Sequence, residues 1–332
     1  MRRNKHVARK IIMDVDTGTD DATAIISAVL AEELDLVAVC TVGGARDLDT
    51  TTKHTLMVLE LLGSSVPVYK GCPGPIVKDL YKHPRNNFVR IAKDEDGNEF
   101  GYHDDFQLPA PKKTAETKHA VSFLIEALSN AEEKTTLVAT GPLTNVAMAL
   151  RIRPDLAQNI EELVCMSGGI NETNITSGGE GNAVADPEAM AIVLESGVKL
   201  TVITLDATHR AALPKEYIDK CKKLHSSVGD FFAEMLFQRV RVYNALQPLK
   251  EKDVAPIHDA LCIAYLIDPS VIDDIRLVPL AISLDHNVAA GAFIIDTRFY
   301  HDPVNASVAY SADPKRFGDI VMCLLEKTAS HQ

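Results

Sequence analysis

The feature that most constrains this chain is an acidic turn within residues 10–22. An apolar run, Ile11 to Met13, leads into the turn, and a second apolar segment, Ala22 to Leu30, follows it. This order predicts a buried strand, a tight turn and the start of a helix. The turn carries Asp14, Asp16, Asp20 and Asp21. Carboxylates this close repel one another unless some are protonated or a cation lies among them. We interpret the turn as a cation site.

Helix capping is the first alternative interpretation of these acidic residues. Asp20 could be an N-cap and Asp21 a favourable first-turn charge, as acidic residues at helix starts often are. Asp14 and Asp16, however, stand at the carboxyl end of the predicted strand, where open α/β sheets bind ligands. Capping does not explain those two residues, so the cation site remains the better interpretation.

Two other acidic motifs are tested by their spacing. An EF-hand loop requires Gly at its sixth position and Glu at its twelfth. Counted from Asp14, those positions hold Thr19 and Ile25, so the EF-hand is excluded. An Asp-nucleophile phosphatase of the haloacid-dehalogenase type also begins with Asp-x-Asp after a strand. It expects Thr or Val where this chain has Gly18, and therefore stays open as a partial match.

Composition limits the classes of partner. The net charge of −12 lacks the basic footprint of a nucleic-acid binder, so we expect a small-molecule partner and no nucleic-acid polymer. No apolar run is long enough to span a bilayer and no apolar segment follows the basic N-terminus, which predicts no membrane association and a cytoplasmic location. The six cysteines form no C-x-x-C pair, which favours reduced thiols.

Hydrophobic patterning predicts an α/β fold. Strands and helices alternate in the first 70 residues, which is typical of a parallel sheet with right-handed crossovers. We predict a single Rossmann-like domain over residues 1–332, with residues 1–9 as a flexible basic tail. Its central sheet would be mostly parallel, with helices on both faces and extra C-terminal strands. Periodicity fades from Lys70 to Lys118, which suggests a functional lid or an insertion. The strands expected after the first are Leu34–Val42, Val66–Tyr69, Thr136–Ala139, Glu161–Met166, Leu200–Leu205, Ile275–Ile282, Ala290–Asp296 and Ala306–Tyr310.

Polar residues follow several of these strands. Because the carboxyl ends of parallel strands open at one edge, we expect several strand ends to meet there. They are Asp14 and Asp16, Thr140, the Gly-rich loop after Met166, and Asp206 to His209. His258 and Asp259 begin a later helix that could approach the same edge. Carboxylates and a backbone carbonyl are the ligands that a hard cation prefers.

The motifs resemble those of the inosine-uridine-preferring nucleoside hydrolases, from about Lys10 to the C-terminus. The matching segments, in order, are Asp14-x-Asp16-x-Gly18-x-Asp20-Asp21-Ala22, Thr140-Gly-Pro-Leu-Thr-Asn145, Met166-Ser-Gly-Gly169, Glu180-x-Asn182, Asp186-Pro-Glu-Ala189 and Ile257-His258-Asp259. The resemblance implies hydrolysis of the N-glycosidic bond of ribonucleosides to ribose and free base. It also implies one Ca²⁺ ion, and we expect a homodimer or homotetramer.

The resemblance assigns roles residue by residue. Asp16, Asp21 and Asp259 would ligate Ca²⁺ through carboxylates and Thr140 through its main-chain oxygen. Asp16 would also be the general base for a metal-bound water, and His258 the acid that protonates the leaving base. Asp14 and Asp20 would belong to the same substrate pocket, Asp20 by a hydrogen bond to ribose and Asp14 by supporting the acidic cluster. The other residues expected to surround the sugar are Met166, Asn174, Glu180 and Asn182.

Three departures from the family pattern concern the substrate. Ala45 stands where an Asn is usual, and Gly181 replaces a common aromatic residue. Tyr102 and His103 occupy the long loop in place of the usual His-Gly-rich segment. The departures motivate a rival hypothesis, in which the chain is a catalytically weak binder of nucleoside and metal on the same fold.

Overall fold

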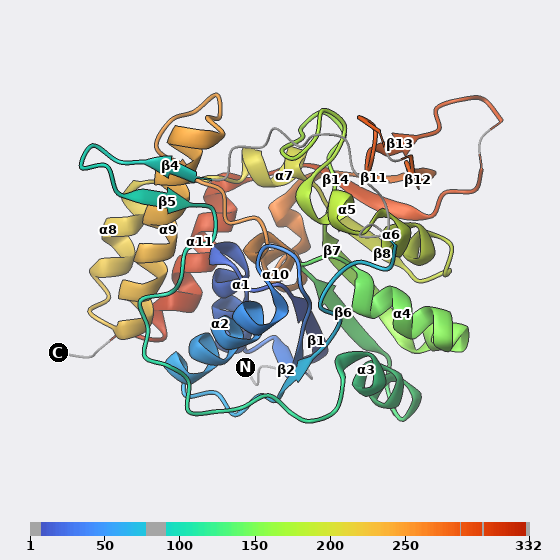
Figure 1. Ribbon diagram of the computed structural model, residues 1–332, viewed down its shortest axis with the longest axis horizontal. Helices are drawn as coiled ribbons and strands as arrows, with labels where there is room; N and C mark the ends of the chain where they lie inside the picture. The colour runs from blue at the N-terminus through green and yellow to red at the C-terminus, as the bar shows by residue number, and fades with distance from the viewer. Residues whose placement is uncertain (1–7, 78–90, 286, 301, 330–332) are drawn as a thin grey trace, which may run out of the picture.

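The computed structural model describes residues 8–77, 91–285, 287–300 and 302–329. Its centre is an eight-stranded sheet in the order β11-β14-β8-β7-β6-β1-β2-β3 (Figure 1). All neighbouring strands pair in parallel except β11 with β14. The strands are β1 (Arg9–Val15), β2 (Leu34–Thr41), β3 (Val68–Lys70), β6 (Thr135–Ala139), β7 (Ile160–Met166), β8 (Leu200–Ile203), β11 (Ile272–Val278) and β14 (Ala306–Ala312).

Helices cover both faces of the sheet because its central strands are apolar on both sides. In β1, Ile11 and Met13 pack into one core, whereas Ile12 packs into the other. The first core is covered by α1 (Thr19–Leu30), α2 (Leu48–Leu61), α8 (Glu216–Lys222), α9 (Ser227–Leu246), α10 (Ala260–Ile267) and α11 (Pro314–Glu326). The second is covered by α3 (Ala120–Ser129), α4 (Thr144–Ile152) and α6 (Pro187–Leu194). The predicted α/β fold class, with a mostly parallel sheet, is confirmed.

The first strand begins one residue earlier than predicted. Residues 1–7 lie outside the described residues, but Arg9 already belongs to β1. Its backbone N–H donates to the Glu33 carbonyl at 2.9 Å, and Arg9 lies opposite Leu34 in the sheet. Assignment of residue 9 to a flexible tail was wrong because a polar residue at a strand end can pair through its backbone alone.

Several predicted loops contain short elements. The polar loop before residue 182 leads into α5 (Gly181–Ala185), and α7 (Leu205–Arg210) replaces the predicted end of β8. The predicted strand at residues 275–282 is divided into β11 and β12 (Leu280–Ile282), and β12 pairs with β13 (Phe293–Ile295) outside the main sheet. Pro279 separates β11 from β12, because it has no N–H to continue the ladder.

The long stretch without periodicity contains a small hairpin. Its strands are β4 (Ile91–Lys93) and β5 (Glu99–Gly101), and β4 packs near α9. Residues 78–90 of this stretch lie outside the described part of the chain. Within the described part, no helix has the length and apolar character needed to cross a membrane.

Candidate active site

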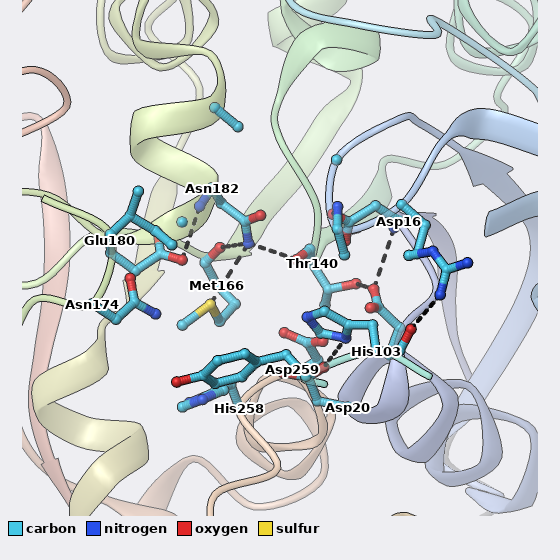
Figure 2. Close-up of a pocket in the computed structure, with 18 of the residues that line it drawn as sticks. Asp16, Asp20, His103, Thr140, Met166, Asn174, Glu180, Asn182, His258 and Asp259 are labelled. Atoms are coloured by element: carbon cyan, nitrogen blue, oxygen red, sulfur yellow. Dashed lines mark hydrogen bonds and ion pairs between the residues drawn. The ribbon is translucent and has the colours of Figure 1, made fainter. Parts of the chain in front are cut away.

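A cavity of about 400 Å³ opens at the carboxyl ends of the central strands. Figure 2 shows Asn174, Glu180, Asn182 and Met166 on one side of it, with Asp16 and His103 on the other. Asp20, Asp21, Thr140, His258 and Asp259 also line the cavity. The sheet thus brings together residues from positions 16 to 259 of the chain, as the convergence of parallel strand ends predicts.

The acidic turn is held by its own backbone. Gly18 is the N-cap of α1, so the alternative that made Asp20 the N-cap was wrong. Asp21 accepts the Gly18 N–H at 2.9 Å and the Asp16 N–H at 3.3 Å. A Cβ on Gly18 would lie 2.1 Å from Nδ1 of His103, so a glycine is needed for the loop to pack here.

Asp16 lies where β1 ends and is fully enclosed. Its Oδ2 accepts the Ala45 N–H at 2.6 Å, and a Cβ on Gly44 would lie 2.1 Å from the same oxygen. Burial raises the pKa of Asp16 well above its ordinary value, and the charge of Asp21 raises it further. A carboxyl group with a raised pKa is poised to accept a proton, as a general base must.

Three buried carboxylates form a candidate metal centre. Asp20, Asp21 and Asp259 each offer an oxygen within 4.8 Å of the others. Burial raises the pKa of Asp21 to about 6, and burial together with Asp20 and Asp21 raises that of Asp259 well above its usual range. Such a cluster of hard oxygen donors could hold a metal ion, whose positive charge would offset the repulsion.

The other two predicted metal ligands are Asp16 and the Thr140 carbonyl, and neither belongs to this group of three. Asp16 is outside the group of three that lies within mutual reach, although its charge acts on Asp259. The Thr140 hydroxyl donates to Asp21 at 2.7 Å, and its carbonyl accepts the Asn182 side-chain amide at 2.7 Å. A carbonyl oxygen has two lone pairs, so one remains for a cation.

The wall opposite Asp16 is polar and firmly held. Asn182 donates its amide to the carbonyl oxygens of Thr140 and Met166, at 2.7 and 3.0 Å. Glu180 accepts N–H groups from Gly168 and Asn182, and burial raises its pKa to about 7. Asn174 lines the cavity with a buried Oδ1 that has no hydrogen-bond partner within the described structure. Such an oxygen is available to a ligand hydroxyl.

Asp14 lies behind the pocket and does not line it, and the prediction that Asp206 to His209 would join the site was wrong because these residues do not line it either. Oδ1 of Asp14 accepts the Asn145 amide at 2.8 Å, and burial raises its pKa to about 7. An Asp-nucleophile phosphatase would need this first Asp at the pocket surface to attack its substrate. The buried position of Asp14 therefore argues against the phosphatase alternative and suits support of the acidic turn.

His258 is enclosed and hydrogen-bonded at both ring nitrogens. Nε2 lies 2.6 Å from the Tyr243 hydroxyl, and Nδ1 lies 2.7 Å from the Thr208 hydroxyl. Burial lowers the pKa of His258 well below its ordinary value, and the positive charge of Arg239 lowers it further. The ring is therefore neutral near pH 7, and a proton from it would have to be replaced through its neighbours.

The sequence analysis missed Arg239 and Tyr243, which line the same cavity from α9. Both are buried, although they stand in the middle of a long helix. No motif marks them. The one available signal is helical spacing, because positions four apart lie on one face of a helix.

Comparisons with known proteins agree with this geometry. A family model described as inosine-uridine preferring nucleoside hydrolase matches residues 11–319. An inosine-uridine preferring nucleoside hydrolase of Crithidia fasciculata is 32% identical over 98% of this chain and 99% of the relative. A pyrimidine-specific ribonucleoside hydrolase of Photobacterium profundum is 33% identical over 98% of this chain and 100% of that protein.

A solved structure carries the same fold. The purine-preferring ribonucleoside hydrolase from Gardnerella vaginalis has a TM-score of 0.82 and 27% identity, over 97% of this chain and 99% of its own. With these similarities, the fold and the acidic pocket define a hydrolase that acts on N-glycosyl bonds. The chain belongs to the inosine-uridine preferring nucleoside hydrolase family, as its motifs predicted.

Proposed function

We propose that this protein is a Ca²⁺-dependent nucleoside N-ribohydrolase. The observation that carries the proposal is the group of buried carboxylates at the start of α1 and the start of α10, in the pocket that Thr140 also lines. Asp16, Asp21, Asp259 and the Thr140 oxygen would hold the ion. Ca²⁺ suits an all-oxygen ligand set, and a bound cation supplies a water of lowered pKa and fixes the ribose diol.

Asp16 is the proposed general base. The water's oxygen bonds to C1′ while its proton goes to the Asp16 carboxylate, and the bond from C1′ to the base breaks with its electron pair on the base nitrogen. The Ala45 N–H fixes one carboxylate oxygen at 2.6 Å, so the other is left to face the water. Proton transfer to a positioned group of this kind contributes about 10²- to 10⁴-fold to a rate.

The sugar lies between the acidic turn and the wall of Asn174, Glu180 and Asn182 in this proposal. Asp20 would accept a ribose hydroxyl on the metal side, and Asn174 and Glu180 would bond the opposite side of the sugar. Met166 would pack beside the ring. The side-chain oxygens of Asp20, Asn174 and Glu180 would also stabilise the positive charge that develops on the sugar as the bond from C1′ to the base breaks.

His258 is the proposed acid for the leaving base. Its hydrogen bond to Tyr243 offers a route by which a proton reaches the pocket: the tyrosine hydroxyl donates to the base as the imidazole donates to the hydroxyl. Because the resting ring is neutral, it would take up a proton from solvent first, so that handing one proton to the base returns the ring to its neutral form. The Thr208 hydroxyl holds the second ring nitrogen.

The substrates we propose are ribonucleosides with purine or pyrimidine bases. Relatives named for inosine-uridine, pyrimidine and purine preference support this range. Ala45 lines the pocket with no side-chain amide to offer, and we propose that activity on ordinary ribonucleosides is correspondingly modest. We also propose a homodimer or homotetramer, on the family resemblance, and a cytoplasmic location.

A nucleoside panel tests this function. Release of free base from uridine, cytidine, inosine, adenosine and guanosine would be followed with the metal removed and with Ca²⁺ restored. The proposal expects base release that depends on Ca²⁺. Measurable nucleoside binding with no base release from any of them would instead establish the binding protein that Ala45 and Gly181 suggested.

A further inference from the structure

The pocket contains one buried arginine that the reaction described so far does not use. Arg239 is 2% exposed and lines the cavity from α9. Its Nε donates to the Pro256 carbonyl at 2.8 Å, and one terminal nitrogen lies 3.4 Å from the Tyr243 hydroxyl. These contacts fix the guanidinium plane, since Nε and one terminal nitrogen are both held.

The charge of Arg239 is only partly balanced. Its nearest carboxylate is Asp20, at 3.6 Å, which is longer than a direct hydrogen bond. Among the described residues, the hydrogen bonds of Arg239 involve Nε and that one terminal nitrogen, so the other terminal nitrogen keeps donors for a ligand. An arginine remains protonated at every working pH, and buried charge acts strongly because the local dielectric is low.

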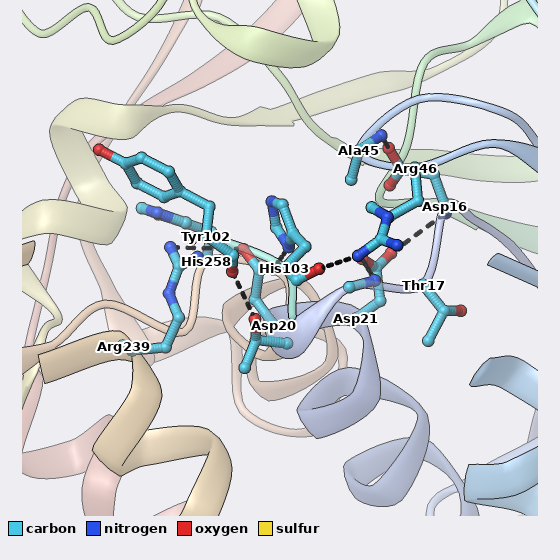
Figure 3. A network of polar contacts seen from close by, with 12 residues as sticks. Asp16, Thr17, Asp20, Asp21, Ala45, Arg46, Tyr102, His103, Arg239 and His258 are labelled. Atoms are coloured by element: carbon cyan, nitrogen blue, oxygen red, sulfur yellow. Dashed lines mark hydrogen bonds and ion pairs between the residues drawn. The ribbon is translucent and has the colours of Figure 1, made fainter. Parts of the chain in front are cut away.

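Arg239 lies beside the two residues that are proposed to protonate the leaving base, Tyr243 and His258. Figure 3 shows it beside Tyr102 and His258, with Asp20 between this group and Asp16. Tyr102, His258 and Arg239 all line the cavity, and a terminal nitrogen of Arg239 lies 3.4 Å from the Tyr243 hydroxyl, which is proposed to pass the proton to the base. The cation therefore lies beside the route by which a proton would reach the leaving base.

We propose that Arg239 contacts the base and stabilises the negative charge that builds up on it as the N-glycosidic bond breaks. Heterolysis moves the bonding electron pair from C1′ to the base nitrogen, and that charge persists until a proton arrives. Because a fixed cation needs no reorganisation, it favours this charged transition state over the neutral ground state. The inference rests on the proposed N-ribohydrolase function.

The positive charge of Arg239 also determines which class of nucleoside the pocket favours. A nucleoside whose base is neutral gains negative charge on the base as the bond breaks, and Arg239 assists it. A nucleoside whose base is already cationic, such as a pyridinium riboside, enters against the charge of Arg239 and departs as a neutral base. Arg239 thus selects neutral nucleosides against cationic ones.

The experiment compares uridine and nicotinamide riboside as substrates of the Ca²⁺-loaded enzyme. Arg239→Gln should lower kcat/KM for uridine by about 10²-fold, the usual effect of losing one such stabilising donor. For nicotinamide riboside, the same variant should leave kcat/KM unchanged or raise it. The ratio of the two kcat/KM values is the decisive quantity, because damage to the fold alone lowers both.

Two further variants keep the test decisive. Arg239→Lys retains the charge and should shift the ratio less than Arg239→Gln does. The lysine variant also provides the test if the glutamine variant does not fold. Arg153→Gln removes an exposed arginine at the end of α4, outside the residues that line the pocket, and should leave the ratio unchanged. Equal losses on both substrates in the Arg239 variants would overturn the inference. No hydrolysis of any nucleoside by the wild-type enzyme would instead overturn the proposed function.

Discussion

The two ends of the pocket are built in different ways. The metal end comes from the carboxyl ends of adjacent parallel strands and from the starts of α1 and α10, and backbone N–H groups of Gly18 and Ala45 hold two of its carboxylates. The base end comes from the middle of α9, from His258 just before α10, and from the loop after β5, which carries Tyr102 and His103. The metal end is therefore fixed by sheet topology, whereas the base end depends on side chains from a helix and a long loop.

The long loop is nevertheless attached to the metal end. The Thr19 hydroxyl donates to the Tyr102 carbonyl at 2.7 Å, and Arg46 donates to the His103 carbonyl at 2.6 Å. Both bonds use the loop's backbone, so the side chains of Tyr102 and His103 can differ without loss of the attachment. The comparison suggests that reaction chemistry is fixed at one end and specificity is adjusted at the other.

The largest effect is expected at the metal end, from Asp16→Asn. The amide oxygen can still accept the Ala45 N–H, but the side chain no longer takes a proton or offers a charge to the metal. We expect base release to fall by about 10³-fold and Ca²⁺ affinity to fall with it. Turnover assays and calorimetric Ca²⁺ titration measure both.

A matched control for Asp16→Asn is Asp206→Asn. Asp206 is also a buried carboxylate near a strand end, but it accepts the N–H groups of Ile170 and Asn171 and does not line the pocket. This variant should keep Ca²⁺ binding and most of its turnover. Full activity of Asp16→Asn would refute the assignment of the metal end.

The next largest effect is expected at the base end, from His258→Ala. Loss of the acid should lower kcat/KM by about 10²-fold for uridine, whose base needs a proton. A nitrophenyl riboside has a leaving group that needs none, so its loss should stay below about tenfold by the same reasoning. Equal losses on the two substrates would show that His258 is not the acid.

A gain is expected from Ala45→Asn. Ala45 lines the pocket close to Asp16, and an asparagine there could donate a hydrogen bond to the ribose. One added bond of about 1 kcal/mol corresponds to an increase in kcat/KM of roughly fivefold. The steady-state kinetics of the variant on uridine measure it. An unchanged or lower value would mean that the missing amide does not limit this enzyme.

The smallest expected effect is on stability as pH changes. Burial raises the pKa of Asp21 to about 6 and that of Glu180 to about 7, both above their ordinary values. Between pH 4 and those values the metal-free native state binds more protons than the unfolded state, so its free energy of unfolding decreases as pH rises. Ca²⁺ needs the ionised carboxylates, so its stabilising effect should increase over the same range.

Thermal unfolding at pH 5.5 and 7.5, with chelator and with Ca²⁺, measures this change. The metal-free protein should unfold at a lower temperature at pH 7.5, and Ca²⁺ should restore more stability there than at pH 5.5. Asp21→Asn should weaken the pH dependence because it removes one of the carboxylates. A metal-free protein that is more stable at pH 7.5 would contradict the proposed origin of these pKa shifts.

The contrast between the metal end and the base end also explains which parts of the site could be predicted from the sequence. The metal end was predictable because an apolar strand followed by acidic residues is a local pattern, and parallel topology brings strand ends together. The base end was not, because α9 contains both Arg239 and Arg241 in an amphipathic segment. The structure buries Arg239 in the pocket and leaves Arg241 partly exposed beside Asp94. Only the tertiary packing of the helix separates the two arginines.

The central claim is that an ion held by the acidic turn enables hydrolysis of a nucleoside. The most direct measurement is base release from uridine and inosine by the chelated enzyme as Ca²⁺ is added back, with bound Ca²⁺ measured in parallel. The account predicts that activity is lost on chelation and returns in proportion to a single bound ion per chain. Equal turnover by the metal-free protein, or no base release when the ion is bound, would contradict it.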